Sequence, residues 1–254
     1  NRYYKKAPQR LREAVNELNK HDLAYTIHLG DFIDQHFSSF DSLVPTWNRL
    51  SSTSYHVLGN HDFEVKDSLK SQIFEKLNLK KRYYSINQND WKFIVLDGTD
   101  LSFYGSLDSI KLNETKKLFS KKESDSLPYA KVYNGGLSKE QFTWIEQELV
   151  DAKDNNQNVG FYCHFPLSPI NNGNLWNTNE LQELIEKNNH VKVFMNGHKH
   201  EGAYDFKNGV HYLTFKGMVN TSDSTSFARA NFYKDSIQIK GYGREVNRTL
   251  IITP

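Results

Sequence analysis

The chain has 254 residues, of which 37% are hydrophobic and 13% are aromatic. This content excludes wholesale disorder, because disordered chains lack the apolar surface that a core requires. The 32 basic and 30 acidic side chains leave a net charge of +2, which does not favour nucleic acid as a partner. No apolar run reaches the roughly 18 residues of a membrane span. The single cysteine, Cys163, excludes an intrachain disulfide framework and favours a cytoplasmic over a periplasmic or secreted protein.

The first part of the chain alternates between predicted helices and strands. Residues 7–20 place Leu11, Val15 and Leu18 at helical spacing among polar residues, which predicts an amphipathic helix. A second helix is expected around residues 40–50. Short β-rich runs predict strands at residues 25–29, 55–58 and 93–96.

The second part continues this alternation and ends in strands. Residues 102–133 carry lysines and serines, which predicts an irregular surface insertion. Ser138–Lys153 is the clearest helix, because Ser138 and Gln141 have the spacing of a capping box. A strand, a helix, a strand and a run of hairpins are then expected at residues 159–163, 181–187, 191–195 and 203–239. The pattern favours one layered α/β domain over residues 1–254.

Four of the predicted strands end in clusters of polar residues. The clusters are Gly30-Asp31-Phe32-Ile33-Asp34, Gly59-Asn60-His61-Asp62, His164-Phe165-Pro166 and Gly197-His198-Lys199-His200. Their carboxylate, amide and imidazole groups suit divalent Mn, Fe, Mg or Zn. Each cluster alone is typical of an ordinary strand end. Their conjunction predicts a metal site, because α/β proteins place ligands at the ends of strands.

In this order, the four clusters resemble the signature of the calcineurin-like metallophosphoesterases. A narrower likeness lies outside them, in Tyr-Asn-Gly-Gly-Leu-Ser-Lys-Glu-Gln at residues 133–141, Lys-Gly-Tyr-Gly-Arg at residues 240–244 and Arg2-Tyr3-Tyr4. These segments resemble the manganese-dependent ADP-ribose/CDP-alcohol diphosphatases. The resemblance implies a four-layer α/β/β/α sandwich with mixed sheets and a centre of two divalent metal ions. It favours manganese, with iron, zinc and magnesium as alternatives.

The resemblance also implies roles for individual residues. It makes Asp31 a bridge between both metals and His200 a ligand of one of them. The ligands of the other metal would be Asn60, His164 and His198. His61 would hydrogen-bond the phosphate or protonate the leaving oxygen, while Asp62 or Asp34 orients nearby groups.

Contacts with the rest of the substrate are suggested by residue type alone. Asn60 also lies where it could contact the phosphate. Phe37 and Trp176 follow the metal motifs and could stack on a nucleobase, although aromatic side chains more often serve packing. Arg244 could pair with a second phosphate, because a guanidinium matches phosphate geometry, or it could remain solvated.

One motif of the family has no counterpart in this sequence. The family's first strand carries an Asp followed two residues later by His or Gln, and no residue before Asp31 fits this pattern. Asp22 follows His21 at a predicted helix end and is not assigned to it. The chain begins with Asn1, which favours a first strand before residue 1. The alternative is that the chain binds one metal well and the other poorly.

These observations predict a hydrolase that cleaves the diphosphate linkage of ADP-ribose or CDP-alcohol derivatives through a hydroxide that bridges the metals. One alternative is a phosphomonoesterase or phosphodiesterase with the same centre. Another is a binding protein that has the fold without catalysis. The expected partner is a small phosphate ester or diphosphate, and the oligomeric state stays open.

Overall fold

The computed structural model describes residues 2–252. Its helices are η1 Tyr4–Lys6, α1 Ala7–Leu18, α2 Ser39–Trp47, η2 His61–Phe63, α3 Asp67–Lys70, α4 Ile73–Lys76, α5 Ser109–Ser124, α6 Lys139–Asp154 and α7 Thr178–Glu186. Its strands are β1 Tyr25–His28, β2 Thr53–His56, β3 Tyr84–Gln88, β4 Trp91–Val95, β5 Asn158–Cys163, β6 Val191–Asn196, β7 Ala203–Lys207, β8 Val210–Thr214, β9 Ser226–Phe232, β10 Ser236–Gly243 and β11 Arg248–Ile251. Within residues 2–252, none of these helices combines the length and apolar character needed to cross a membrane.

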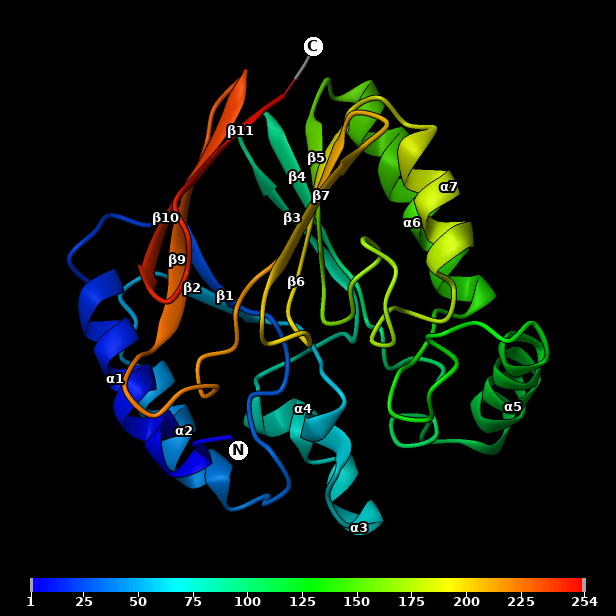
Figure 1. Cartoon of the computed structure of the whole chain (residues 1–254), viewed down its shortest axis with the longest axis horizontal. Coiled ribbons are helices and arrows are strands. Elements are labelled where there is room, and N and C mark those ends of the chain that lie inside the picture. Colours follow the sequence, from blue (N-terminus) through cyan, green and yellow to red (C-terminus); the bar gives the residue numbers. More distant parts are fainter. Residues whose placement is uncertain (1, 253–254) are drawn as a thin grey trace.

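The elements form the four-layer α/β/β/α sandwich that the resemblance implied (Figure 1). A six-stranded mixed sheet has the order β3-β4-β5-β6-β8-β7, and α6 and α7 cover its outer face. Opposite its inner face lie two smaller sheets, β1-β2 and β11-β10-β9. Helices α1 and α2 lie outside this second layer of strands.

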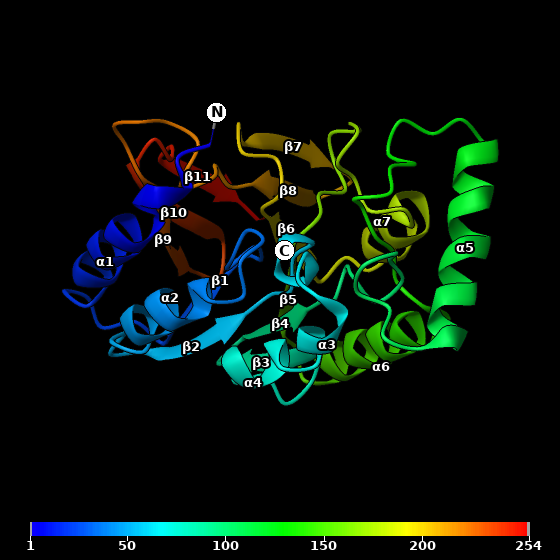
Figure 2. The ribbon, with the colours of Figure 1, turned by 90° about the horizontal axis from the view of Figure 1, so that it is seen from below.

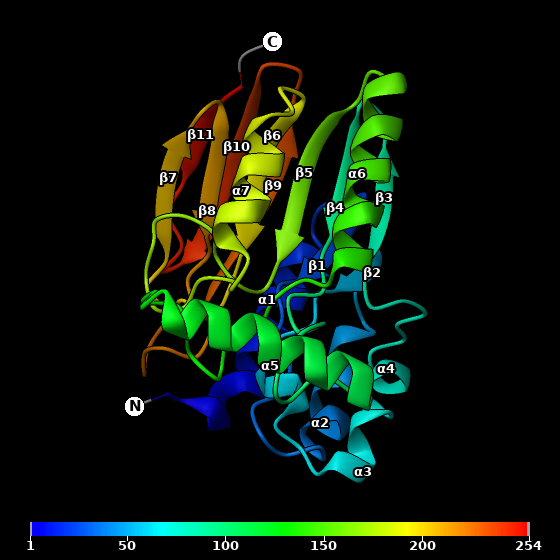
Figure 3. The same ribbon diagram turned by 90° about the vertical axis from the view of Figure 1, so that its right-hand side faces the viewer.

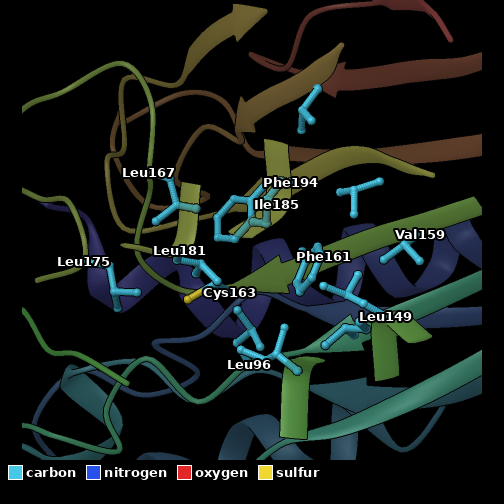
Figure 4. Packing of buried hydrophobic residues seen from close by; sticks show 14 of the residues in the cluster. Leu96, Leu149, Val159, Phe161, Cys163, Leu167, Leu175, Leu181, Ile185 and Phe194 are labelled. Atoms are coloured by element: carbon cyan, nitrogen blue, oxygen red, sulfur yellow. The ribbon is translucent and has the colours of Figure 1, made fainter. Parts of the chain in front are cut away.

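The core between the large sheet and its helices is strongly apolar. Every residue of β6 is buried, as expected for a strand covered on both faces. Figure 4 shows Phe161 and Phe194 packed with Leu149 and Ile185 from the covering helices. Cys163 lies in the same cluster, where burial raises the pKa of its thiol to about 12. This thiol is therefore a packing group rather than a ligand.

The two helices with the clearest sequence patterns are confirmed. Helix α1 buries Leu11, Val15 and Leu18 along one side. Helix α6 begins after Ser138, whose side chain accepts a hydrogen bond from the backbone N–H of Gln141. Residue spacing therefore predicted the N-cap correctly. The reciprocal half of the capping box does not form, because the N–H of Ser138 donates to Asp100 and the Gln141 side chain bonds the backbone of Asp97.

The prediction of an irregular segment over residues 102–133 is wrong in its middle, where α5 forms a regular helix of 16 residues. The helix begins after Asp108, whose side chain accepts a hydrogen bond from the N–H of Lys111. It carries no apolar stripe, since its buried residues are Thr115 and Lys122. Sequence periodicity could not reveal it for this reason. The surface location was correct, because α5 lies at the edge of the molecule (Figure 2).

The topology brings the predicted polar clusters to one end of the molecule. Strands β4, β5, β6 and β8 run parallel, and β1 runs parallel to β2. The loops that follow β1, β2, β5 and β6 meet at the lower end in Figure 3. Parallel strands place their carboxyl ends at the same edge, where α/β proteins bind ligands.

A buried histidine in the second layer makes stability depend on pH. His56 packs against Trp47 and Phe32, with ring centroids 4.9 and 5.0 Å away. Burial lowers the pKa of His56 to about 3, and burial also lowers the pKa of the neighbouring His28 to about 4. The unfolded chain therefore binds more protons below the ordinary histidine pKa of about 6.5, and stability is lost as the pH falls from there.

We expect the free energy of unfolding to fall between pH 7 and pH 5, with a contribution of about 2 kcal/mol from His56. The substitution His56→Leu should flatten this dependence, as measured by urea unfolding at both pH values. His36→Leu is the control, because His36 is exposed. An unchanged slope in His56→Leu would assign the pH dependence to other groups.

Candidate metal centre

Asp31 is held in a strained loop directly after β1. Its φ angle of 56° lies in the left-handed region. One carboxylate oxygen, Oδ1, accepts a hydrogen bond from the N–H of His61 at 2.9 Å. A Cβ atom at Gly59 would lie 2.3 Å from both the N and Oδ1 of Asp31, so this position requires glycine. The close approach of the two loops fixes the direction of the carboxylate.

Two histidines from other strands converge on the same carboxylate. His164 Nε2 lies 3.2 Å from Asp31 Oδ2, and His198 Nδ1 lies 3.1 Å from His164 Nε2. One ligand atom from each of these three residues lies within 4.8 Å of the other two. His164 follows β5 and His198 follows β6, so the parallel sheet positions both.

In each of the two histidines, the ring nitrogen that points away from Asp31 lies within hydrogen-bonding distance of a carbonyl oxygen. His164 Nδ1 lies 2.8 Å from the carbonyl oxygen of Leu29. His198 Nε2 lies 3.2 Å from Oδ1 of Asn134. A carbonyl oxygen can only accept, so these nitrogens carry the protons and leave lone pairs on the two nitrogens near Asp31. Metal-binding histidines are oriented in this way.

The charges in the cluster also suit a cation. Burial acts to raise the pKa of the Asp31 carboxyl. The nearby His164, His61 and His198 act in the opposite direction and together outweigh burial, so the pKa of Asp31 is lowered overall. Burial and the neighbouring His164 lower the pKa of His198 well below its ordinary value. An ionised carboxylate and a neutral imidazole are the protonation states that a divalent metal requires.

Asn60 and His200 lie beside the cluster with unused polar atoms. Oδ1 of Asn60 is buried and has no hydrogen-bond partner among the described residues. Nδ1 of His200 is likewise buried without a partner in residues 2–252. His200 does not belong to the group of ligand atoms from Asp31, His164 and His198 that lie within 4.8 Å of one another. Burial lowers the pKa of His200 to about 4. Two buried polar atoms without partners, next to a carboxylate and two imidazoles, are available as further metal ligands.

His61 lies between acidic and basic side chains at the mouth of the site. Its Nδ1 is 3.1 Å from Asp34 Oδ1 and 3.2 Å from Glu64 Oε2. On the other side of the ring, Nη1 of Arg2 lies 3.2 Å from Nε2. Since a guanidinium can only donate, Nε2 accepts and the ring proton lies on Nδ1, next to the carboxylates.

Asp62 is completely buried and supports the site from behind. Its carboxylate accepts hydrogen bonds from the N–H groups of Asp31, Phe32, Ile33 and Gly59. Burial and the charge of Asp31 raise its pKa to about 7, against the effect of the Gly59 and Ile33 N–H groups. Asp62 therefore positions the loop of Asp31 and does not face the substrate.

The structure contradicts one of the suggested aromatic substrate contacts and leaves the other as a prediction. Trp176 is fully buried against Phe103 and Phe119, so the expectation that it stacks on a nucleobase is wrong. Phe37 is half-buried against Phe40.

Arg244 donates a hydrogen bond to the carbonyl oxygen of Gly217 at 2.6 Å. A Cβ atom at Gly217 would lie 2.6 Å from the ring of His200, so Arg244 anchors the loop behind this histidine. Nε of Arg244 is buried without a hydrogen-bond partner among the described residues, so its contact with a second phosphate stays a prediction.

Sequence reasoning missed the roles of Arg2, Asn134 and Glu64. Arg2 and Asn134 belong to segments that were recognised as similar to a family, but neither segment follows a metal-binding strand. Glu64 lies three residues after His61, and only the turn of η2 brings it back to that ring. Its spacing from His61 was the one available signal.

Comparisons with known proteins show what this chain is similar to. A family model described as calcineurin-like phosphoesterase matches residues 5–202. A manganese-dependent ADP-ribose/CDP-alcohol diphosphatase of Arabidopsis thaliana is 28% identical, with 96% of this chain and 87% of the relative covered. The Homo sapiens protein of the same name is 26% identical, covering 98% and 85%. A crystal structure of a dimetal phosphatase from Danio rerio superposes with a TM-score of 0.89 at 24% identity, covering 99% and 91%.

Proposed function

The chain belongs to the calcineurin-like phosphoesterase family, and we propose that it hydrolyses the diphosphate linkage of ADP-ribose or CDP-alcohol derivatives. It is a metal-dependent hydrolase of phosphate compounds. The choice of a diphosphate rests on the names of relatives that align over nearly the whole chain. Manganese is the favoured cation for the same reason.

The observation that carries the proposal is the convergence of Asp31, His164 and His198 with their protons directed away from the centre. We assign these three residues and Asn60 to the cations, with His200 completing the second position. The donor set contains oxygen and imidazole nitrogen without thiolate, which suits manganese. A bound pair of divalent cations would neutralise phosphate charge and acidify a water molecule.

The surrounding residues would orient the phosphate and supply a proton. The guanidinium of Arg2 points into the site and offers N–H donors that match phosphate oxygens. Nδ1 of His61 lies near the carboxylates of Asp34 and Glu64, and its Nε2 faces the guanidinium of Arg2. When Nε2 is protonated, it can donate to the leaving oxygen as the bond to phosphorus breaks.

The experiment measures product release from ADP-ribose and from CDP-choline, with and without Mn²⁺, and uses a phosphomonoester as the comparison substrate. We expect Mn²⁺-dependent release of AMP and CMP, with little cleavage of the monoester. Cleavage of the monoester alone would keep the family mechanism and contradict the diphosphate substrate. A lack of turnover on all three would contradict the proposed substrate class.

Removal of the Arg2 guanidinium should weaken substrate binding. We expect Arg2→Met to raise KM about 10- to 100-fold, because a hydrogen bond to a charged group contributes about 1.5–3 kcal/mol. Steady-state kinetics on ADP-ribose measure this change. Arg12→Met is the matched control, since Arg12 is exposed on α1. A KM that is equal in both variants would show that Arg2 does not bind the phosphate.

A further inference from the structure

The outer face of the sheet β11-β10-β9 places two positive charges directly opposite each other. In the antiparallel pairing of β9 with β10, Arg229 lies opposite Lys240. Both side chains belong to the outer face, because Ile237 and Ile239 of β10 are buried toward the large sheet and Lys240 is exposed. Like charges that face each other across two strands destabilise a sheet. An anion bound between them would offset this repulsion.

The guanidinium of Arg229 is held beside Lys240. Its Nη1 donates to Nδ1 of His21 at 2.8 Å, so the side chain is tied to the turn after α1. Its Nε is buried and has no hydrogen-bond partner among the described residues. Within residues 2–252, neither Arg229 nor Lys240 forms an ion pair with a carboxylate. The two charges are therefore close together and unneutralised.

Hydrogen bonds from Arg229 also direct a hydroxyl donor to the same place. A guanidinium can only donate, so Nδ1 of His21 accepts and the ring proton lies on Nε2. This nitrogen lies 3.3 Å from the hydroxyl oxygen of Tyr242. Glu17 lies farther from it, at 3.7 Å, and is paired with Lys20. Tyr242 therefore accepts from His21, and its own hydroxyl hydrogen is available to another acceptor.

A surface pocket of about 450 Å³ opens over these groups. Arg229, Lys240 and Tyr242 line it, together with the side chains of Asn231, Gln238 and Asn247. The Oδ1 of Asn247 accepts from the N–H of Gly241 at 2.9 Å, which leaves its Nδ2 hydrogens for another acceptor. Among the described residues, no aspartate or glutamate lines the pocket. The pocket thus combines positive charge with neutral hydrogen-bond donors.

We propose that this pocket binds a dianionic phosphate group between Arg229 and Lys240. A phosphate monoester carries nearly two negative charges at pH 7 and offers three acceptor oxygens, which match the two cations and the donors of Tyr242 and Asn247. A carboxylate carries one charge and would leave one cation without a counterion. The pocket shares no lining residue with the metal centre, so it is a second site for phosphate compounds.

The test titrates the full chain with inorganic phosphate and follows the backbone amide NMR signals of β9 and β10, with Mg²⁺ replacing paramagnetic Mn²⁺. We expect a saturable shift of the Arg229 and Lys240 signals. Lys240→Gln and Arg229→Gln should each raise the Kd about tenfold or more, because hydrogen bonds between charged groups are the stronger ones. Lys240→Arg keeps the charge and should keep most of the affinity. Lys153→Gln is the control, since Lys153 is exposed on α6.

A second readout concerns the repulsion itself and needs no ligand. In buffer without phosphate, Lys240→Gln should raise the thermal midpoint by about 1–3 °C, because it removes the charge that faces Arg229. The control Lys153→Gln should leave the midpoint unchanged. Added phosphate should then raise the midpoint of the wild type more than that of Lys240→Gln, because a ligand stabilises the folded state that binds it.

Three outcomes would overturn the inference. The first is a phosphate-dependent shift confined to residues of the metal centre. The second is an equal Kd at the β9 and β10 signals in Lys240→Gln and Lys153→Gln. The third is a lower midpoint in Lys240→Gln, which would mean that a stabilising partner already faces Lys240. Titration with AMP identifies the source of the phosphate group. Tighter binding of AMP would support a phosphate ester, and equal binding would support free phosphate. None of these readouts depends on the proposed substrate.

Discussion

Asp31→Asn is expected to abolish metal-dependent hydrolysis while the fold persists. Asparagine preserves the size of the side chain, and it tolerates the left-handed backbone at this position. Its oxygen can still accept the hydrogen bond from the N–H of His61. The substitution removes the negative charge that two histidines face, so cations lose their central ligand. We expect turnover to fall about a thousandfold or more, equivalent to roughly 4 kcal/mol of transition-state stabilisation.

The measurement combines three quantities on the purified variant. These are Mn²⁺-dependent turnover of ADP-ribose, the metal content after dialysis and the thermal midpoint. Asp67→Asn serves as the control, because the Asp67 side chain is 93% exposed. Turnover in Asp31→Asn equal to that of the control would refute the proposed centre. A collapse of the thermal midpoint would instead assign Asp31 a structural role.

The convergence of Asp31, His164 and His198 could be predicted from the order of strands and polar residues in the sequence. Strands β5 and β6 are parallel neighbours, so the polar residues that follow them must gather at one edge. Asp31 follows β1 of a separate two-stranded sheet, and the order of the four polar clusters is what grouped it with the other two. The sequence shows each strand as an apolar run and each polar residue directly after it. No knowledge of side-chain packing was needed to group Asp31 with His164 and His198.

The contacts around that cluster were not predictable, because they join segments that lie far apart in the sequence. Asn134 reaches His198 from a loop 64 residues earlier, and Arg2 reaches His61 from 59 residues away. Trp176 follows the third of the four polar clusters in the sequence, yet its ring is fully buried and packs against Phe119 of α5. The place of Trp176 after a metal motif suggested a substrate contact, whereas its residue type already favoured the packing role that the structure shows.

Loss of the Asp62 side chain should lower the stability of the protein strongly. Asp62→Ala leaves four backbone N–H groups without their acceptor, in a position where the side chain is fully buried. An unsatisfied buried donor costs about 1–3 kcal/mol, so we expect a loss of about 4 kcal/mol or more in the free energy of unfolding. Urea unfolding at pH 7 measures this loss.

Asp62→Asn is the milder variant, which should still fold if Asp62→Ala does not. Asparagine keeps one acceptor oxygen for two of the four donors, so we expect a smaller loss of about 2 kcal/mol. The two N–H groups left without an acceptor are those of Asp31 and Gly59 or those of Phe32 and Ile33, depending on which way the amide is oriented. Because Asp62 holds the loop that aims Asp31, metal affinity should also fall about 10- to 100-fold, as for other groups that orient ligands.

The two readouts together determine how Asp62 acts. A positioning role requires that stability and Mn²⁺ affinity decrease in the same order, from wild type through Asp62→Asn to Asp62→Ala. Loss of stability at unchanged Mn²⁺ affinity would mean that the loop of Asp31 keeps its shape without these hydrogen bonds. The strained φ angle of Asp31 argues against that outcome, because a left-handed non-glycine residue persists only where its surroundings hold it in place.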